Sequence, residues 1–327
     1  MTIQARAQAS GISFVDLEPS LESFEHAVLT GLAASPKSIP SKFFYDEAGS
    51  RLFEDITTLD EYYPTRTEKR ILADNIGEIA GLIGPAAELV EFGAGALDKV
   101  RILLDTLVDP AAYVALDISR DFLLTSAQDL ASDHPDLDIT AVCADYSKPF
   151  DLPAAGPGAR RRVGFFPGST IGNFTREEAA DFLANAARLL GAGGALLIGV
   201  DTRKDQAVLH AAYNDARGIT AAFNLNLLAR INRELDGDFD LDRFRHDARW
   251  NETAGRVEMH LVSSRAQTVT VAGRPFDFAS GETIHTENSY KYRVEAFSDL
   301  ATAAGWRPRA VWQDADRLFS LHYLEVA

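Results

Sequence analysis

Residues 88–95 read ELVEFGAG, a short apolar stretch that ends in two glycines and leads directly into residues 97–107. A strand that passes through a glycine turn into a helix is typical of an open α/β sheet, which binds ligands at the carboxyl ends of its strands. Glycine allows the close backbone approach that a Cβ forbids. The stretch predicts a ligand site at this turn, unless the glycines serve only a tight connection. The helical spacing that follows is seen at Val100, Leu103, Leu104 and Leu107.

The same alternation of short apolar runs and amphipathic helices continues along the chain. Thr175 is the expected N-cap of a helix that ends at Gly191. After a helix over residues 293–305, two further strands return to the sheet. This pattern predicts a doubly wound, Rossmann-like α/β fold. The expected strands are residues 88–92, 113–117, 139–144, 163–167, 195–200, 307–313 and 318–325.

The rest of the chain predicts a second domain of mixed helices and strands. Thr65 and Glu68 have the spacing of a capping box, which would start the first helix of the sheet domain. We expect that domain to comprise residues 65–202 plus 290–327, and an inserted α+β domain to comprise residues 1–64 plus 203–289. Within the inserted domain the expected elements are helices at residues 20–32, 49–57, 207–217 and 220–235, and one strand of an antiparallel hairpin at residues 256–263.

Charge and cysteine content exclude several classes of protein. The 327 residues carry 32 Lys and Arg against 48 Asp and Glu, a net charge of −16, which repels a nucleic-acid backbone. The single cysteine cannot form an intrachain disulfide, which fits a reducing compartment. The N-terminus lacks the basic and apolar regions of a signal peptide, and no stretch approaches the roughly 20 apolar residues of a membrane span. We expect a cytoplasmic monomer that binds a small molecule, without nucleic-acid or membrane partners.

Acidic residues follow the second and third predicted strands. Asp117 ends the second strand, where its carboxylate can accept from both hydroxyls of a ribose; it could instead cap the next helix. Asp145 and Tyr146 follow the third strand and offer an acid for an adenine amino group with a ring beside it, or form a solvated loop. Asp98 occupies the sixth position of the glycine motif, where a dinucleotide fold needs a small residue. A nucleoside cofactor without a pyrophosphate is therefore favoured over NAD.

Small and hydroxyl residues follow the fourth predicted strand. Residues 168–175 read GSTIGNFT, so that hydroxyls, backbone groups and the Asn173 amide gather close to the cofactor edge. Such a mixture of donors and acceptors suits the carboxylate and amine of an α-amino acid. The alternative is a loop whose polar side chains satisfy only its own backbone.

Several motifs outside the sheet pattern combine with the glycine turn and Lys99. They are KFFYDEAGSRLFEDIT from Lys42, LDEYYPTRTE from Leu59, GSTIGNFT from Gly168, ITAAFN from Ile219, VEMH from Val257 and TENSYKY from Thr286. Together they closely resemble the histidine-specific Nα-methyltransferases of ergothioneine biosynthesis, which belong to the class I S-adenosylmethionine (SAM) dependent methyltransferases. The resemblance runs from about residue 35 to the C-terminus. It implies that SAM methylates the α-amine of L-histidine three times, giving the betaine hercynine, without a metal.

The resemblance also implies roles for individual residues. The imidazole would be bound by Glu287 and Ser289, because a carboxylate accepts from a ring N–H and a hydroxyl serves the other ring nitrogen. The alternative for Glu287 is an exposed carboxylate on an edge strand. The implied catalytic residues are Tyr45, Thr170 and Asn173; the other substrate-binding residues are Tyr62, Gly168, Tyr213 and Met259; and the SAM-binding residues are Gly93, Gly95, Lys99, Asp117, Asp145 and Tyr146.

Other functions and sites remain as alternatives at this point. A methyltransferase could act on another amino acid or an aromatic amine, a NAD-dependent oxidoreductase would share the sheet, and a SAM- or histidine-binding sensor would keep the pockets without turnover. His260 and His285 lack the sequence spacing of a metal-ligand pair, so we expect no metal site. Residues 236–242 place acids at alternating positions but lack the glutamate of a calcium loop, and we expect a solvated turn there.

Overall fold

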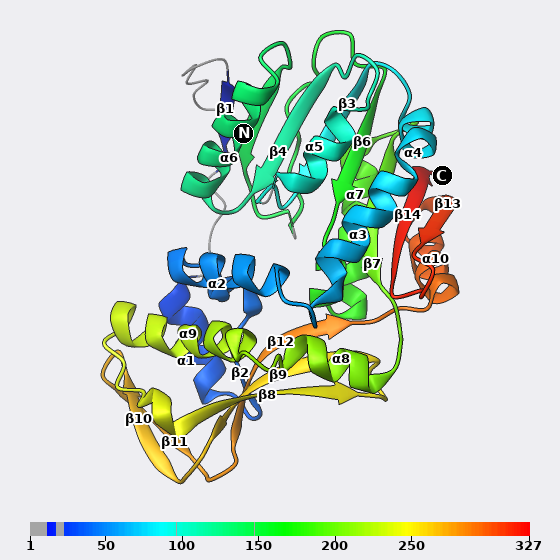
Figure 1. Ribbon diagram of the computed structural model, residues 1–327. Helices are drawn as coiled ribbons and strands as arrows, with labels where there is room; N and C mark the ends of the chain where they lie inside the picture. Colours follow the sequence, from blue (N-terminus) through cyan, green and yellow to red (C-terminus); the bar gives the residue numbers. More distant parts are fainter. Residues whose placement is uncertain (1–11, 18–22, 96, 147) are drawn as a thin grey trace. The chain divides into compact units, whose positions relative to one another are not determined.

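A computed structural model describes residues 12–17, 23–95, 97–146 and 148–327 (Figure 1). The chain divides into two compact units, which are described separately. Unit 1 comprises Met1–Ser20, Thr67–Thr202 and Tyr292–Ala327, and unit 2 comprises Leu21–Arg66 and Arg203–Lys291. Within the described residues, none of the helices has both the length and the apolar composition that crossing a membrane requires.

Unit 1 is built around an eight-stranded sheet of order β1-β5-β4-β3-β6-β7-β14-β13. The first six strands in this order are parallel, whereas β14 runs antiparallel between β7 and β13. The doubly wound fold predicted from the sequence is therefore confirmed. The strands are β1 (Ile12–Asp16), β3 (Ala87–Phe92), β4 (Ala112–Asp117), β5 (Ile139–Cys143), β6 (Arg161–Phe166), β7 (Ala195–Asp201), β13 (Trp306–Gln313) and β14 (Phe319–Val326).

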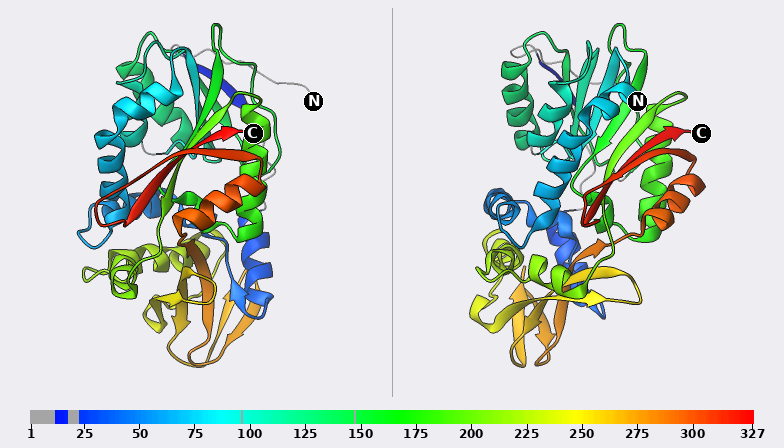
Figure 2. Two further views of the ribbon diagram at one scale, coloured as in Figure 1. Left: turned by 90° about the vertical axis from the view of Figure 1, so that its right-hand side faces the viewer. Right: turned by 45° about the vertical axis from the view of Figure 1, so that its right-hand side comes forward.

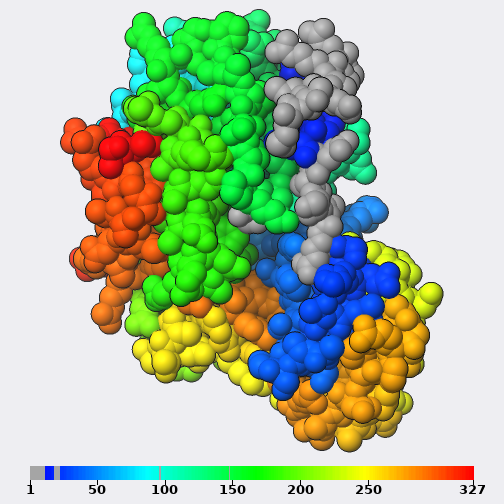
Figure 3. Space-filling view, turned by 180° about the vertical axis from the view of Figure 1, so that it is seen from behind, coloured from blue at the N-terminus to red at the C-terminus, as the bar shows by residue number. Residues whose placement is uncertain are grey.

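Helices cover both faces of this sheet (Figures 1 and 2). One face packs against α3 (Tyr63–Asp74), α4 (Ile76–Ile83), α5 (Asp98–Leu104) and α6 (Arg120–Asp133). The other packs against α7 (Arg176–Leu190) and α10 (Val294–Ala303), which Figure 3 shows from behind in green and orange. Because both faces are covered, the central strands β3 and β7 are buried at every position rather than alternating between buried and exposed residues. The expected cap at Thr175 and end at Gly191 bound α7.

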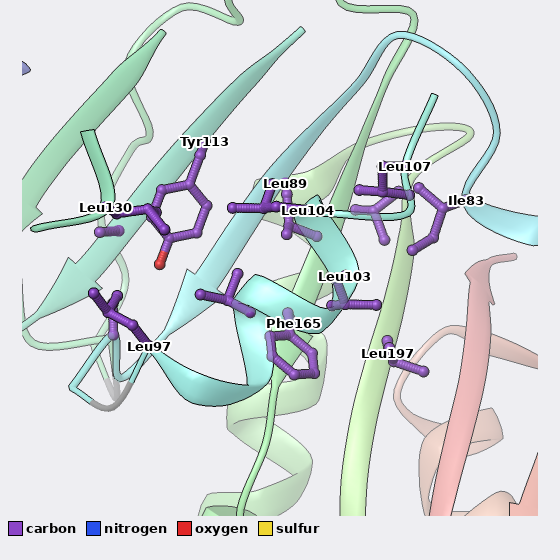
Figure 4. Close-up of a cluster of buried hydrophobic side chains, with 14 of the residues drawn as sticks. Ile83, Leu89, Leu97, Leu103, Leu104, Leu107, Tyr113, Leu130, Phe165 and Leu197 are labelled. Atoms are coloured by element: carbon purple, nitrogen blue, oxygen red, sulfur yellow. The ribbon is translucent and has the colours of Figure 1, made fainter. Parts of the chain in front are cut away.

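The core beneath α5 draws side chains from neighbouring strands into one layer (Figure 4). Leu89, Phe165 and Leu197 project from β3, β6 and β7 and pack with Leu103 and Leu104 of the helix. All five are at most 4% exposed. Burial of this kind, at about 25 cal/mol per Å² of apolar surface, fixes β3 and α5 and hence the glycine turn that joins them.

The edge strand β1 corrects the expected domain boundary. Residues 1–64 were expected to belong to the inserted domain, but Ile12–Asp16 pair in parallel with β5, Ile12 opposite Ile139. Ile12, Phe14 and Val15 are buried, so this apolar stretch covers an otherwise open edge of the large sheet. The helix expected over residues 20–32 begins at Phe24; Ser20 and Leu21 lie outside the described residues.

Unit 2 is an α+β unit with a four-stranded sheet of order β2-β12-β9-β8 and a separate hairpin of β10 and β11. Asp215 accepts the backbone N–H groups of Ile219 and Thr220 and so caps the long helix α9. The antiparallel hairpin predicted to contain residues 256–263 is confirmed, because β9 pairs antiparallel with β8. The strands are β2 (Lys37–Ser38), β8 (Phe244–Asn251), β9 (Arg256–Ser263), β10 (Gln267–Val271), β11 (Arg274–Phe278) and β12 (Thr283–Tyr290), and the helices are α1 (Phe24–Ala33), α2 (Glu47–Thr57), α8 (Gln206–Tyr213) and α9 (Ile219–Glu234).

Candidate active site

The glycine turn after β3 forms the first part of the candidate site, in unit 1. Gly93 has φ +77°, a left-handed conformation that favours glycine, and its N–H donates to the Leu116 carbonyl of β4 at 2.8 Å. A Cβ on Gly93 would lie 3.4 Å from the Tyr146 hydroxyl, and one on Gly95 would lie 3.0 Å from the Phe122 ring. The two glycines therefore allow a tight turn with aromatic rings close beside it.

The predicted acids stand at the ends of the neighbouring strands. Asp117 ends β4, and one of its oxygens accepts the Ser119 N–H at 2.7 Å, so it also serves the start of α6. Burial raises the pKa of Asp117. Asp145 follows β5 and lies 3.5 Å from the Lys148 ammonium. Because parallel strands end at one edge of a sheet, both acids lie on the same edge as the glycine turn.

Glu68, which was expected to complete a capping box, instead links two parts of this edge. Helix α3 begins at Tyr63, so Thr65 lies inside the helix and the capping-box prediction is wrong. Glu68 is 1% exposed; it pairs with the Lys99 ammonium and accepts the Gly168 N–H at 2.9 and 3.0 Å. This carboxylate therefore holds Lys99 beside the loop that follows β6.

Glu91 of β3 lies behind the glycine turn and is fully buried. It accepts from the Tyr113 hydroxyl, and its other oxygen has no hydrogen-bond partner within the described chain. Burial raises the pKa of Glu91 to about 8, although the Tyr113 bond and the Lys99 charge act in the opposite direction. A cation that approached this carboxyl would lower its pKa again, so the edge favours a positively charged ligand.

The loop after β6 is a tight turn that leads into a 3-10 helix, η2 (Thr170–Asn173). Gly168 and Ser169 both have positive φ, +80° and +58°. The Thr170 hydroxyl donates to the Pro167 carbonyl at 3.0 Å, so this side chain also serves the loop's own backbone, as the alternative interpretation proposed. Within the described chain the half-buried Asn173 amide makes no hydrogen bond, which leaves it available to a ligand.

Unit 2 brings together the residues expected around an imidazole. Glu287 and Ser289 lie two residues apart on β12, and Met259 of β9 is the cross-strand neighbour of Glu287. The Tyr213 hydroxyl, at the end of α8, lies 2.7 Å from the Ser289 hydroxyl. The Tyr62 ring meets the Tyr213 ring edge to face, with centroids 6.4 Å apart. These five residues line one face of the small sheet.

A β-bulge at Thr286 decides which β12 side chains share this face. His285 lies opposite His260, whereas Glu287 lies opposite Met259, so one extra residue separates the two pairs. The Thr286 hydroxyl bonds to the Met259 carbonyl at 3.1 Å, which holds the extra residue in place. Without the bulge His285 and Glu287 would point the same way. The bulge therefore directs Glu287 and Ser289 to one face and His285 to the other.

Sequence reasoning missed Lys291, which lies under the same residues. Its side chain is buried, and its ammonium donates to the Tyr213 hydroxyl at 2.8 Å and to the Ser289 hydroxyl at 2.7 Å. Burial raises the pKa of Glu287 to about 7, and the charge of Lys291 opposes that rise. The signal was present in TENSYKY, because Lys291 follows Ser289 at the two-residue spacing of side chains on one face of a strand.

Tyr45 belongs to an aromatic run in unit 2. It is 43% exposed and meets the rings of Phe53 and Phe223 at 5.7 and 5.8 Å. Phe53 in turn meets Tyr62 at 6.4 Å. Aromatic faces attract cations. The run therefore extends from the imidazole residues to an exposed phenol.

On the opposite face of this sheet the ligand atoms of Glu258, His260 and His285 lie within 4.8 Å of one another. The two histidines lack the spacing of a ligand pair in the sequence, but β9 and β12 make them cross-strand neighbours whose rings stack 4.9 Å apart. Glu258, however, accepts from Arg256 at 2.6 Å and from Asn251 at 2.9 Å. The positive charge of the Arg256 guanidinium beside Glu258 would repel a metal cation at the same place. We therefore interpret Glu258, His260 and His285 as a hydrogen-bonded network.

Comparison with known families decides how these features are to be understood. Residues 24–326 match the family described as histidine-specific, SAM-dependent methyltransferases. The chain belongs to this family. As a SAM-dependent methyltransferase it uses SAM as its cofactor. The alternative of a NAD-dependent oxidoreductase is therefore set aside.

Individual relatives of this methyltransferase show the same relationship. The histidine N-alpha-methyltransferase of Mycolicibacterium smegmatis is 42% identical, across 94% of this chain and 97% of the relative. Ergothioneine biosynthesis protein 1 of Neurospora crassa is 33% identical across 88% of this chain, which spans 33% of that longer protein. Among solved structures, a SAM-dependent methyltransferase from Clostridium acetobutylicum is 11% identical with a TM-score of 0.48, across 85% of this chain and 98% of that one.

The residues of this methyltransferase edge fit SAM. The cofactor combines a sulfonium and an ammonium with a carboxylate and a nucleoside, and the edge offers carboxyl groups at Glu91, Asp117 and Asp145 together with the ammonium of Lys99. One buried oxygen of Glu91 has no hydrogen-bond partner within the described chain, so it can accept from a donor or interact with a cation of the cofactor. A pyrophosphate would instead be repelled by these carboxylates.

Proposed function

We propose that this protein transfers three methyl groups from SAM to the α-amine of L-histidine and so forms hercynine, in the first step of ergothioneine biosynthesis. One observation carries the proposal: Glu287 and Ser289 share a face with Tyr213 and offer an anionic acceptor beside a hydroxyl, the pair that an imidazole needs. The names of the two relatives above support the same substrate and pathway.

We assign the cofactor to unit 1. Asp117 accepts from the ribose hydroxyls, Asp145 and Tyr146 bind the adenine, and Gly93 and Gly95 let the cofactor approach the backbone. Lys99, held in place by Glu68, pairs with the cofactor's carboxylate. When bound, SAM supplies a methyl group on a positively charged sulfur.

The substrate's head group is assigned to the loop after β6 and to tyrosines. Asn173 and Tyr213 bind the carboxylate and amine, with the backbone of Gly168 and Thr170 beside them. An ammonium has no lone pair, so the amine must lose a proton before it reacts; Tyr45, being exposed, can pass that proton to water. No strong base is needed, because positioning the amine at about 3 Å supplies most of the rate.

Tyr62 and Met259 complete the imidazole pocket in unit 2. Leaving a ring nitrogen unpaired in such a site costs about 1–3 kcal/mol, which disfavours other amino acids. A methyltransferase for another amine, or a sensor without turnover, would keep the same residues. We further propose a cytoplasmic monomer without nucleic-acid partners, in keeping with the net charge of −16.

Replacing Asn173 with Ala separates the two assignments. We expect kcat for histidine methylation to fall about 10²-fold, because the head group loses its positioning amide, while the Kd for SAM changes little. Calorimetry with SAM and steady-state kinetics measure the two quantities. Asn75→Ala is the matched control, since within the described residues that amide donates to the Ile71 carbonyl at the junction of α3 and α4, away from the loop after β6. A collapse of SAM affinity in Asn173→Ala would show that the two sites are not separate.

The pKa of Glu287 predicts a pH dependence. Burial raises this pKa to about 7, and only the ionised carboxylate accepts from an imidazole N–H, so kcat/KM should fall as the pH drops through about 7. Glu287→Gln keeps a carbonyl acceptor but cannot titrate. With the same substrate, the variant's pH profile should lose this acidic limb. A variant profile that keeps the wild-type limb would assign the titration to another group.

A further inference from the structure

Lys291 is a buried cation under the proposed imidazole pocket, and its position there needs a physical reason. Its side chain is 1% exposed. Burying an ammonium is costly unless its N–H groups are bonded. Here the ammonium donates to two hydroxyls of the pocket. Its nitrogen lies 2.8 Å from the Tyr213 oxygen and 2.7 Å from the Ser289 oxygen, and those two oxygens lie 2.7 Å apart.

The number of hydrogen-bonding protons on Lys291, Tyr213 and Ser289 limits which hydrogen bonds these three residues can make to a ligand. An ammonium only donates, so both hydroxyl oxygens accept from Lys291. One hydroxyl proton is then used between Tyr213 and Ser289. If Tyr213 donates it, Ser289 already accepts two hydrogen bonds and can only donate outward. Both hydroxyls accept from Lys291, but a phenol is more acidic than an aliphatic hydroxyl and is therefore the stronger donor of the two, which favours this arrangement.

We propose that Lys291 is a positioning residue that sets the direction of the hydrogen bonds in the imidazole pocket. Through it, Ser289 donates to the bare ring nitrogen while Glu287 accepts from the ring N–H. The pocket thereby selects the neutral imidazole, and selects the one tautomer that carries its proton on the nitrogen facing Glu287. This inference rests on the proposed function, because it assigns the ring of histidine to these residues.

Electrostatics act in the same direction. The charge of Lys291 opposes the rise in the pKa of Glu287 that burial causes, and it repels an imidazolium. Among the residues that the structure describes, the other ionisable groups near Glu287 on its face are the phenols of Tyr213 and Tyr62. The histidines and Glu258 belong to the opposite face of the sheet. Lys291 is thus the cation that faces this carboxylate.

The test replaces Lys291 with Met, which keeps the length of the side chain and removes its donors and charge. We expect KM for histidine to rise roughly 10- to 100-fold with a smaller change in kcat, and the Kd for SAM to stay the same. The acidic limb of kcat/KM should move to higher pH, because Glu287 loses the charge that opposes its protonation. Lys291→Gln, whose amide still donates, should recover part of the affinity.

Lys204→Met is the matched control. Lys204 also donates to a tyrosine hydroxyl in unit 2, that of Tyr63 at 2.6 Å, and lies 4.4 Å from that ring. The Lys204→Met variant should leave the acidic limb of kcat/KM in place. If Lys291→Met keeps both the wild-type KM and the wild-type limb, the inference is overturned while the proposed function stands.

The proposed function fails separately, if the wild-type protein does not methylate histidine. Should Lys291→Met not fold, as thermal unfolding would show, Lys291→Gln decides the matter by calorimetry with histidine. Weaker binding with a shifted pH limb supports the role of Lys291, and unchanged binding at every pH contradicts it.

Discussion

Replacing Glu287 with Ala should lower kcat/KM for L-histidine by about 10²-fold or more. The variant removes the anionic acceptor of the imidazole N–H, and a hydrogen bond to a charged group contributes about 1.5–3 kcal/mol. It also leaves the buried Lys291 ammonium without the carboxylate that faces it. The effect should appear mainly in KM, because the ring is bound in the ground state as well as during transfer. Steady-state kinetics with histidine measure it.

The control for this variant is Glu282→Ala. Glu282 precedes the same strand, but its carboxylate pairs with Lys37 rather than with the pocket residues. We expect its kcat/KM to stay within about threefold of wild type, as exposed or half-exposed ion pairs contribute little. The Kd for SAM should be unchanged in both variants, since the residues assigned to SAM belong to unit 1. Equal activity of Glu287→Ala and wild type would remove the basis for histidine as the substrate.

Replacing Glu68 with Ala should both destabilise the protein and weaken SAM binding. Removing one partner of a buried ion pair costs about 3–5 kcal/mol, and here the variant strips a partner from Lys99 and from the Gly168 N–H together. Because Lys99 is then no longer held beside the loop, the Kd for SAM should rise at least roughly tenfold. Urea unfolding gives the free energy of unfolding, and calorimetry gives the Kd.

Glu88 offers a matched comparison at the other end of β3. It is also buried, pairs with Arg162 and accepts a glycine N–H, that of Gly156 at 2.8 Å. Glu88→Ala should lose a similar free energy of unfolding, yet its folded fraction should bind SAM with the wild-type Kd. If both variants weaken SAM binding equally, Glu68 acts only through stability and our assignment of Lys99 is contradicted.

The parallel sheet could be predicted because its signals are local. The glycine turn after residue 92 and the cap at Thr175 each lie within a few residues of the element that they bound. The strand β1 was missed because a five-residue stretch near the start has no local partner; its role appears only when it pairs with β5, whose first residue is Ile139. Strand pairing over such a separation leaves no trace in the spacing of residues.

In the candidate site, too, the residues of local motifs could be predicted, whereas contacts between distant parts of the chain could not. Residues named by motif, such as Glu287 and Ser289, share one face in the structure. Glu68 was misjudged because its partners are 31 and 100 residues away, whereas the capping-box rule considers only its neighbours. The stacking of His260 on His285 depends on the register of β12 against β9, and the bulge that follows turns Glu287 to the other face; neither has a clear mark in the sequence.

The central claim is that this protein trimethylates the α-amine of histidine. The most direct test incubates the purified protein with SAM and each of the twenty amino acids, and follows one, two and three added methyl groups by mass spectrometry. Our account predicts trimethylated histidine and no comparable product from the other amino acids. Methylation of a different amino acid, or no methylation of any of them, would contradict it.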